Sequence, residues 1–216
     1  MKVLIITGGT VDAQARQSAL AFAPDLTIAA DKGIENALRA GIPFDRILGD
    51  FDSIDPHALD QARGQHLPET VFPTHKDYTD TELALFEAMQ EAGAGGQILI
   101  LGGTGTRLDH TLANLFLLKQ PADQGIDCLI QDGHDQIRLL KGPARLTLAK
   151  DPAWPFVSLL PVFGSAQGVT LEGFQYPLQD GVLEPGVSLG ISNELDAEEG
   201  SVSLKAGYLL VLRTRD

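Results

Sequence analysis

Short apolar runs alternate with amphipathic segments over the first two thirds of the chain, and this alternation limits the fold more than any other feature. Apolar runs at Val3–Ile6, Leu26–Ala30 and Ile98–Leu101 are typical of buried strands. The alternation predicts an α/β domain with a mainly parallel, Rossmann-like sheet covered by helices. In such sheets ligands bind at the carboxyl ends of the strands, so we expect the segments that follow the strands to form a site.

Helix signals lie between the predicted strands. Helices are predicted at Asp12–Phe22 and Gly33–Ala40. Another begins at Asp55-Pro56, because aspartate suits the N-cap and proline the first helical position. Thr79 and Glu82 have the spacing of a capping box. Asp109 opens the last predicted helix. The apolar faces expected for the last two helices consist of Leu83, Phe86 and Met89 and of Leu112, Leu115 and Phe116.

The pattern changes near residue 135, beyond which no helical period continues. Short apolar runs separated by Gly, Pro, Asn and Asp predict an antiparallel sandwich or small barrel. We therefore predict an α/β domain over residues 1–138 and a smaller all-β sandwich over 139–216. The expected strands include Ile137–Leu140, Leu146–Leu148, Val157–Leu160, Val169–Leu171, Val187–Ile191, Val202–Leu204 and Tyr208–Leu212.

Composition excludes several classes of function. The 216 residues carry a formal net charge of −13, which disfavours binding to nucleic acid or to anionic membranes. The single cysteine, Cys128, excludes an intrachain disulfide and a cysteine-based zinc site. No run has the length of a membrane span or the pattern of a signal sequence, so the expected location is the cytoplasm.

The segment Gly49-Asp50-Phe51-Asp52 follows an apolar run and carries two carboxylates at a spacing of two. On an extended chain such side chains point the same way, so Asp50 and Asp52 can face one point beyond the strand. Mutual repulsion of the two carboxylates favours a bound cation, and Mg²⁺ prefers oxygen ligands. The alternative is a plain turn with solvated aspartates.

Other polar segments follow the remaining predicted strands. Asp31 and Lys32 follow the predicted strand Leu26–Ala30, and His75 and Lys76 follow a short predicted strand at Thr70–Phe72. The strand Ile98–Leu101 is followed by a loop with Gly102, Gly103, Gly105 and Arg107. Glycines allow backbone N–H groups to approach phosphate, and a guanidinium matches phosphate geometry. The alternative for this loop is a tight strand-to-helix turn.

The remaining acidic residues each have a structural alternative. Asp80 suits the first turn of a helix because it complements the helix dipole. Asp77 can be a loop acid, Asp109 an N-cap, and His110 a packed or capping side chain. In the second domain, the segments around Tyr176 and Ser192-Asn193 can be hairpin turns with a core aromatic.

Five motifs together resemble the thiamine pyrophosphokinase family. They are Gly49-Asp50-Phe51-Asp52-Ser53-Ile54, Lys76-Asp77-Tyr78-Thr79-Asp80-Thr81-Glu82, Gly102-Gly103-Thr104-Gly105-Thr106-Arg107-Leu108-Asp109-His110, Gly173-Phe174-Gln175-Tyr176-Pro177-Leu178 and Ser192-Asn193-Glu194. The resemblance implies a homodimer with active sites between subunits. It also implies transfer of the pyrophosphoryl group of ATP to the hydroxyl of thiamine, which yields thiamine diphosphate and AMP.

The resemblance also implies a role for each matching residue. Asp50, Asp52 and Asp80 correspond to the magnesium carboxylates, and Asp77 and Asp109 are further candidate catalytic acids. The expected ATP contacts are Asp31, Lys32, Gly102, Gly103, Gly105 and Arg107. The expected thiamine contacts are Tyr176, Ser192 and Asn193. The chain departs from the family pattern at Lys32, where many members have glycine or arginine, and at Thr106, where glycine is frequent.

Two rival functions stay open at this point. A related diphosphotransferase acting on another alcohol, such as a hydroxymethyl pterin, would keep the acidic motifs and need a different second domain. A non-catalytic nucleotide or thiamine sensor would bind without turnover. The presence of Asp50, Asp52 and Asp80 together weighs against the sensor.

Overall fold

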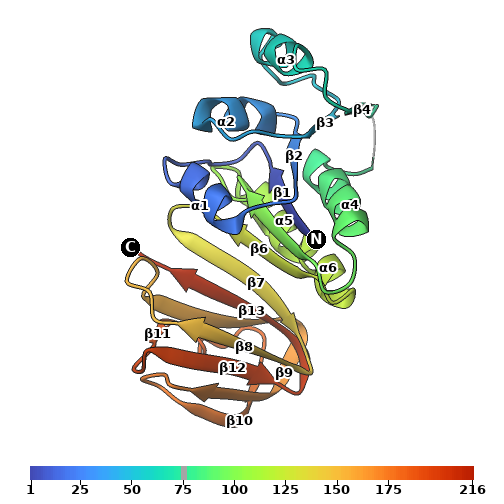
Figure 1. Ribbon diagram of the computed structural model, residues 1–216. Coiled ribbons are helices and arrows are strands. Elements are labelled where there is room, and N and C mark those ends of the chain that lie inside the picture. The colour runs from blue at the N-terminus through green and yellow to red at the C-terminus, as the bar shows by residue number, and fades with distance from the viewer. Residues whose placement is uncertain (74–76) are drawn as a thin grey trace. The chain divides into compact units, whose positions relative to one another are not determined.

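The chain forms two compact units, Met1–Gly133 and His134–Asp216 (Figure 1). The computed structural model describes residues 1–73 and 77–216. The first unit alternates strands and helices, and the second is rich in β-strands, so the predicted order of an α/β domain and a β-rich domain is confirmed. The predicted functional domains divide the chain five residues later, at 138/139. In the described residues, no helix has the length and apolar character needed to cross a membrane.

The described strands of the first unit pair in parallel. Their order is β4-β3-β2-β1-β5-β6. The connections from β1 proceed toward β2 on one side, whereas β5 lies on the other, so a topological switch point lies between β1 and β5. The bounds are β1 (Lys2–Ile6), β2 (Leu26–Ala30), β3 (Arg46–Gly49), β4 (Glu69–Val71), β5 (Gln97–Leu101) and β6 (Asp127–Gln131).

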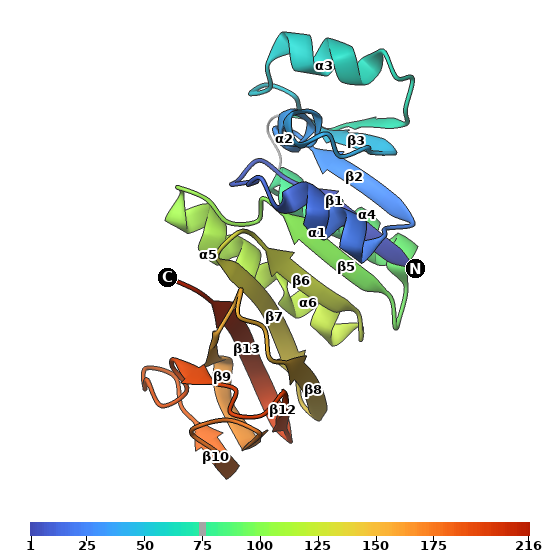
Figure 2. The same ribbon diagram turned by 60° about the vertical axis from the view of Figure 1, so that its left-hand side comes forward.

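Alternate side chains of these strands enter cores on opposite faces of the sheet. On one face Leu4 and Ile6 join a cluster that includes Ala15, Ala37 and Ala62. These alanines belong to α1 (Ala15–Phe22), α2 (Gly33–Ala40) and α3 (Pro56–Arg63). The other face is covered by α4 (Asp80–Ala92), which packs on β1, β2, β3 and β5. Figure 2 shows α1 and α4 on opposite sides of the sheet.

Two predicted helix starts are confirmed by their capping bonds. The Asp55 carboxylate accepts a hydrogen bond of 2.7 Å from the backbone N–H of His57, and Pro56 begins α3. Thr79 Oγ1 accepts from the backbone N–H of Glu82 at 3.2 Å at the start of α4. The predicted start of α1 at Asp12 is wrong by three residues. The Asp12 carboxylate accepts from the Gln14 backbone N–H and forms a turn before the helix.

The predicted apolar faces of the last two helices need correction. In α4 the buried side chains are Thr81, Ala84, Leu85, Ala88, Met89 and Ala92, whereas Leu83 and Phe86 are half-buried. Small side chains bring this helix close to the sheet, and a search for large apolar residues overlooks them. In α5 (Leu108–Leu117) Asn114 is buried, while Leu112 and Phe116 are exposed. A short helix, α6 (Lys119–Asp123), follows.

The second unit is antiparallel throughout its described pairings. Strands pair in the order β7-β13-β9-β12-β8, and β10 and β11 also pair with β9. A core that includes Val157, Val169 and Leu209 lies within the unit. The bounds are β7 (Asp135–Lys141), β8 (Ala144–Ala149), β9 (Phe156–Glu172), β10 (Leu178–Leu183), β11 (Asn193–Glu194), β12 (Glu199–Leu204) and β13 (Ala206–Thr214).

Two strand predictions in this unit need correction. The runs Val157–Leu160 and Val169–Leu171 are strand as predicted, but they belong to one long strand, β9, whose pairing with β13 shifts register between Ala206 and Tyr208. The predicted strand Val187–Ile191 is a series of turns. Its apolar side chains are exposed, so they supply no buried face to hold a strand in a sheet.

The start of α2 gives a test of backbone packing. A Cβ on Gly33 would lie 1.9 Å from the carbonyl oxygen of Ile6, so α2 and β1 would have to separate. We expect Gly33→Ala to lower the free energy of unfolding by about 2–3 kcal/mol. Gly64→Ala is the matched control, because its Cβ would approach no atom closer than Asp60 O at 3.3 Å. Denaturant unfolding measures both variants, and equal stabilities would contradict the packing argument.

Candidate active site

A cavity of about 620 Å³ opens at the carboxyl ends of the strands, on both sides of the switch point between β1 and β5. Its walls come from the loops after β1, β2, β3 and β5 and from the first turns of α4 and α5. This is the edge at which the sequence predicted a site. The volume suits a small organic ligand of nucleotide size.

All six residues predicted for ATP line this cavity. They are Asp31, Lys32, Gly102, Gly103, Gly105 and Arg107, together with Asp50 and Asp80 of the predicted metal set. Asp52, Asp77 and Asp109 are exposed and are not among its lining residues. His75 and Lys76 lie outside the described residues. The predicted thiamine residues Tyr176, Ser192 and Asn193 belong to the second unit.

Asp31 carries the clearest sign of an absent partner at the site. Its Oδ2 accepts a hydrogen bond of 2.8 Å from Ser53 Oγ, whereas its Oδ1 is buried and has no hydrogen-bond partner. An unpaired buried carboxylate oxygen is costly, so a cation or a donor from a ligand would stabilise it. The Oδ1 of neighbouring Asp50 accepts from the backbone N–H of Asp52 at 3.2 Å.

The carboxylates on the cavity wall fit a magnesium ion that is shared with a substrate. Among residues 1–73 and 77–216, no three His, Cys, Asp or Glu side chains form a ready-made metal site. Mg²⁺, however, is usually held by one or two carboxylates together with substrate phosphates and water, rather than by a cage of protein ligands. Asp50 and Asp80, with the unpaired oxygen of Asp31, provide such a partial set.

Two glycine loops are joined by backbone hydrogen bonds at the base of the cavity. The Gly9 N–H donates to Gly102 O at 3.0 Å, and the Thr10 N–H donates to Thr104 O at 2.7 Å. A Cβ on Gly9 would lie 2.0 Å from Thr104 O, so only glycine permits this approach. The loops after β1 and β5 therefore act as one backbone surface.

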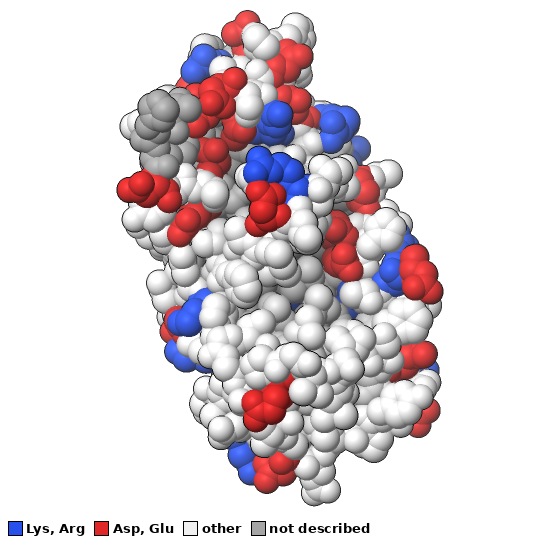
Figure 3. Space-filling view, turned by 180° about the vertical axis from the view of Figure 1, so that it is seen from behind, with Lys and Arg blue, Asp and Glu red and all other residues white. Residues whose placement is uncertain are grey.

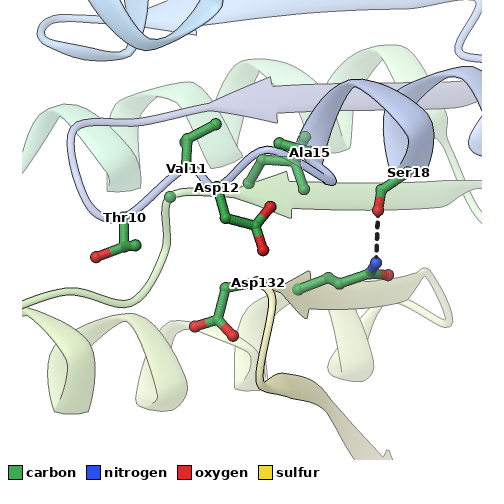
Figure 4. A pocket seen from close by; sticks show the side chains of 9 residues that line it. Thr10, Val11, Asp12, Ala15, Ser18 and Asp132 are labelled. Carbon is green, nitrogen blue, oxygen red and sulfur yellow. Dashed lines mark hydrogen bonds between the residues drawn. The ribbon is translucent and has the colours of Figure 1, made fainter. Parts of the chain in front are cut away.

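Side-chain hydrogen bonds also hold these two loops in place. Thr7 Oγ1 and Thr81 Oγ1 form a buried hydrogen bond of 2.8 Å, which ties the loop after β1 to α4. Thr104 Oγ1 donates to Asp132 Oδ2 from the loop after β5. A second, very small cavity, which Asp12 and Asp132 help to line, lies beside the segments that follow β1 and β5 (Figure 4). This cavity is too small for a substrate.

Arg107 and Asp109 form an exposed ion pair at the N-terminus of α5. Arg107 Nη2 lies 2.5 Å from Asp109 Oδ2, and Arg107 Nε lies 3.2 Å from Oδ1. The hydrogen bonds from Arg107 lower the pKa of Asp109 to about 2, and those bonds raise the pKa of Arg107. A carboxylate with so low a pKa is a weak proton acceptor at neutral pH. Asp109 does not cap α5, whose N-cap residue is Arg107.

Some residues on the cavity wall were not identified from the sequence. Asn114 and Thr111 of α5 line it, and so does Tyr78, whose ring packs edge-on against Phe86 with centroids 5.6 Å apart. His110, predicted to be packed or capping, is exposed on the cavity instead. A polar Asn114 within an apolar helix is the one signal that could have been recognised beforehand.

The predicted thiamine residues form a compact group within the second unit. The Tyr176 ring is 70% exposed, whereas Asn193 is buried. The Asn193 amide holds the backbone of Tyr176 by two hydrogen bonds, one accepted from Tyr176 N at 3.1 Å and one donated to Tyr176 O at 2.8 Å. The backbone N–H of Ser192 donates to Ser158 Oγ. An exposed aromatic on a fixed backbone is suited to stacking against a flat ligand.

Charge on the first unit is uneven. On the face seen in Figure 3, acidic side chains surround a smaller group of Lys and Arg side chains over this unit. Lys32 and Arg107 are cations among the described residues that line the cavity. Because the whole chain carries −13, a polyanionic ligand would depend on these local cations and on backbone N–H groups.

Two family models match this chain and together span both units. Residues 19–130 match the model described as "Thiamin pyrophosphokinase, catalytic domain", and residues 144–209 match "Thiamin pyrophosphokinase, vitamin B1 binding domain". The chain belongs to the thiamin pyrophosphokinase family. The resemblance inferred from the five sequence motifs is thereby confirmed.

Individual family members agree with this assignment. Thiamine pyrophosphokinase of Bacillus subtilis is 33% identical over 89% of this chain and 93% of its own length. A crystal structure of that enzyme covers both chains completely with a TM-score of 0.89. The thiamin pyrophosphokinase structure from Geobacillus thermodenitrificans has a TM-score of 0.84 at 31% identity, covering 100% of this chain and 98% of that one.

The Arg107–Asp109 pair gives a prediction about pH. We expect the Asp109 carboxyl to titrate near pH 2, and Arg107→Gln to return its pKa toward the ordinary value of 3.8. Because the pKa is lowered in the folded protein, any stability from the pair is present above pH 3.8 and is lost as the pH falls toward 2. Carboxyl-detected NMR measures the titration, with Lys119→Gln as a control that leaves Asp109 unchanged. A wild-type midpoint near 4 would contradict the pairing.

Proposed function

We propose that this protein transfers the pyrophosphoryl group of ATP to the hydroxyl of thiamine, giving thiamine diphosphate and AMP. The observation that carries the proposal is the cavity at the β1/β5 switch point in a chain of this family. Acidic side chains form one part of its wall, and glycine loops with a basic residue form another. These are the two kinds of group needed to hold a metal-bound triphosphate.

The triphosphate would lie over the loop after β5. Backbone N–H groups of Gly103 and Gly105 and the N-terminus of α5 favour negative charge there. Arg107 would turn from Asp109 to the phosphates. The change is inexpensive because an exposed ion pair contributes little to stability. Lys32, on the opposite wall, would provide a second positive charge.

Asp50 and Asp80 would hold Mg²⁺, with Asp52 added from the adjacent turn and Asp31 beside them. When bound, the ion would neutralise phosphate charge and favour attack on phosphorus. The protein's own part is positional. Asp31 has one oxygen fixed by Ser53, which leaves the other directed toward a cationic partner. The lining acids are thus held ready for a cation.

In the transfer, the thiamine hydroxyl oxygen would attack the β-phosphorus of ATP. The new O–P bond forms as the bond from that phosphorus to the α–β bridging oxygen breaks, and AMP leaves. The hydroxyl proton must pass to an acceptor. Of Asp77, Asp80 and Asp109, only Asp80 lines the cavity. Asp80 is therefore our candidate for orienting the hydroxyl or accepting its proton.

The second domain would bind thiamine. We assign residues 1–138 to catalysis and residues 139–216 to thiamine binding and dimerisation. Tyr176 would stack on a ring of thiamine, and Ser192 and Asn193 would support that contact. Each unit exposes apolar side chains that a partner subunit could cover: Leu108, Leu112 and Phe116 on α5, and Val187, Leu189 and Ile191 in the second unit. A homodimer with shared active sites, located in the cytoplasm, completes the proposal.

Substitution of the predicted metal ligands tests the reaction. We expect Asp50→Ala and Asp52→Ala each to lower AMP release with thiamine on the order of a thousandfold, because charge neutralisation is lost. The thermal midpoint should stay close to that of the wild type. Asp60→Ala is the control, since this exposed acid on α3 lies outside the cavity-lining set. Near-normal turnover in Asp50→Ala or Asp52→Ala would refute that residue's metal role. Faster turnover of a hydroxymethyl pterin than of thiamine would show that thiamine is not the preferred substrate.

Subunit mixing tests the shared site. We expect Asp50→Ala and Tyr176→Ala homodimers each to be impaired, and mixed dimers of the two to recover part of the activity. Recovery follows because one of the two sites in a mixed dimer would combine the intact first domain of one subunit with the intact second domain of the other. Light scattering verifies the dimer. Mixed dimers without recovery would place both substrates within one subunit.

A further inference from the structure

The chain contains three asparagines, Asn36, Asn114 and Asn193, and all three are buried. Their exposed fractions are 5%, 9% and 7%. A buried amide is costly unless its hydrogen bonds are made. In each case the side chain bonds to the backbone of a loop: the loop after β1 lines the cavity, and the other two loops carry predicted ligand contacts. All the asparagines of the protein therefore share one structural use.

Asn36 of α2 uses both amide hydrogens on the loop after β1. Its Nδ2 donates to Thr7 O at 2.7 Å and to Gly9 O at 3.0 Å. Its Oδ1 accepts from Arg39 Nη2. No donor of Asn36 is left over for a ligand, and the residue is not among those lining the cavity. Its contribution to the site is the shape of the glycine loop.

Asn114 of α5 does the same for the loop after β5, where Nδ2 donates to Gly103 O at 2.7 Å. The two loops are bonded to each other through Gly9 and Gly102. With its carbonyl oxygen engaged by Asn114, Gly103 is held in one orientation of its peptide. The planar peptide that joins Gly103 to Thr104 is thereby fixed at the cavity wall.

In the second unit, the Asn193 amide bonds to both backbone polar groups of Tyr176. It accepts from Tyr176 N and donates to Tyr176 O, and its Oδ1 also accepts from Glu194 N at 2.9 Å. The sequence suggested that Asn193 contacts thiamine directly. The bonds show instead that its amide is occupied by the backbone that carries the exposed Tyr176 ring.

We propose that Asn36 and Asn114 are positioning residues for the triphosphate of ATP and that Asn193 is a positioning residue for the ring stacked on Tyr176. The assignment of ligands rests on the proposed function. Asparagine suits the task because it is short, uncharged and able to donate to a carbonyl oxygen. Aspartate has nearly the same shape but would place a negative charge against those carbonyl oxygens.

The test is a cross-comparison of Asn36→Asp, Asn114→Asp and Asn193→Asp in the full chain. We expect Asn36→Asp and Asn114→Asp to raise KM for ATP on the order of tenfold with little change in KM for thiamine. We expect Asn193→Asp to raise KM for thiamine on the order of tenfold with little change in KM for ATP. Calorimetry with a non-hydrolysable ATP analogue and with thiamine should give the same division in Kd. These binding measurements hold whether or not thiamine is turned over, so failure of the proposed reaction is separable from failure of this proposal.

A matched control removes a similar clamp at the opposite edge of the sheet. Asp45 Oδ2 accepts from the backbone N–H of Thr27 at 2.8 Å, and Asp45→Ala should lower stability without changing either KM. If an aspartate variant fails to fold by circular dichroism, Asn→Ser at the same position replaces it. Equal changes in both substrates' KM or Kd, or none in any folded variant, would overturn the proposal.

Discussion

The site depends on the direct hydrogen bonding of two loops that belong to neighbouring strands. The bonds from Gly9 N to Gly102 O and from Thr10 N to Thr104 O join the chain after β1 to the chain after β5. The two loops lie at the switch point, where the connections of adjacent parallel strands leave in opposite directions. A crevice forms there between the diverging loops, and its base is backbone instead of side chain. The rest of the first unit maintains that geometry.

Backbone at the base of the site has an electrostatic consequence for so acidic a protein. A triphosphate approaching a chain of net charge −13 meets repulsion unless positive potential is concentrated locally. Peptide N–H groups and the N-terminus of α5 supply partial positive charge without adding lysine or arginine. In the proposed complex, the acids Asp31, Asp50 and Asp80 on the wall would not oppose binding, because a bound dication would offset their charge.

The sequence predicted the strands of the first domain and the edge where the site lies, since apolar runs and strand-end loops are local patterns. The caps of α3 and α4 were predictable for the same reason. The buried face of α4 was not, because alanines at the sheet face give a weak hydrophobic signal. Nor was the long strand β9, since its length depends on pairing with β13 and β12, far away in the sequence. The roles of Asn36, Asn114 and Asn193 depend on backbone partners that no local pattern reveals.

Arg107 illustrates why the sequence can identify a site residue correctly and still not reveal its ion-pair partner. Sequence patterns placed a guanidinium beside a glycine loop, and the structure places it on the cavity wall. Its present partner, Asp109, holds it by two hydrogen bonds, yet both side chains are well exposed. In water such a pair exchanges partners at little cost, because solvent screens the attraction. A phosphate group carries more charge than one carboxylate and offers the same planar match to the guanidinium. The ion pair with Asp109 therefore holds Arg107 at the N-terminus of α5, where a more highly charged anion would displace the carboxylate.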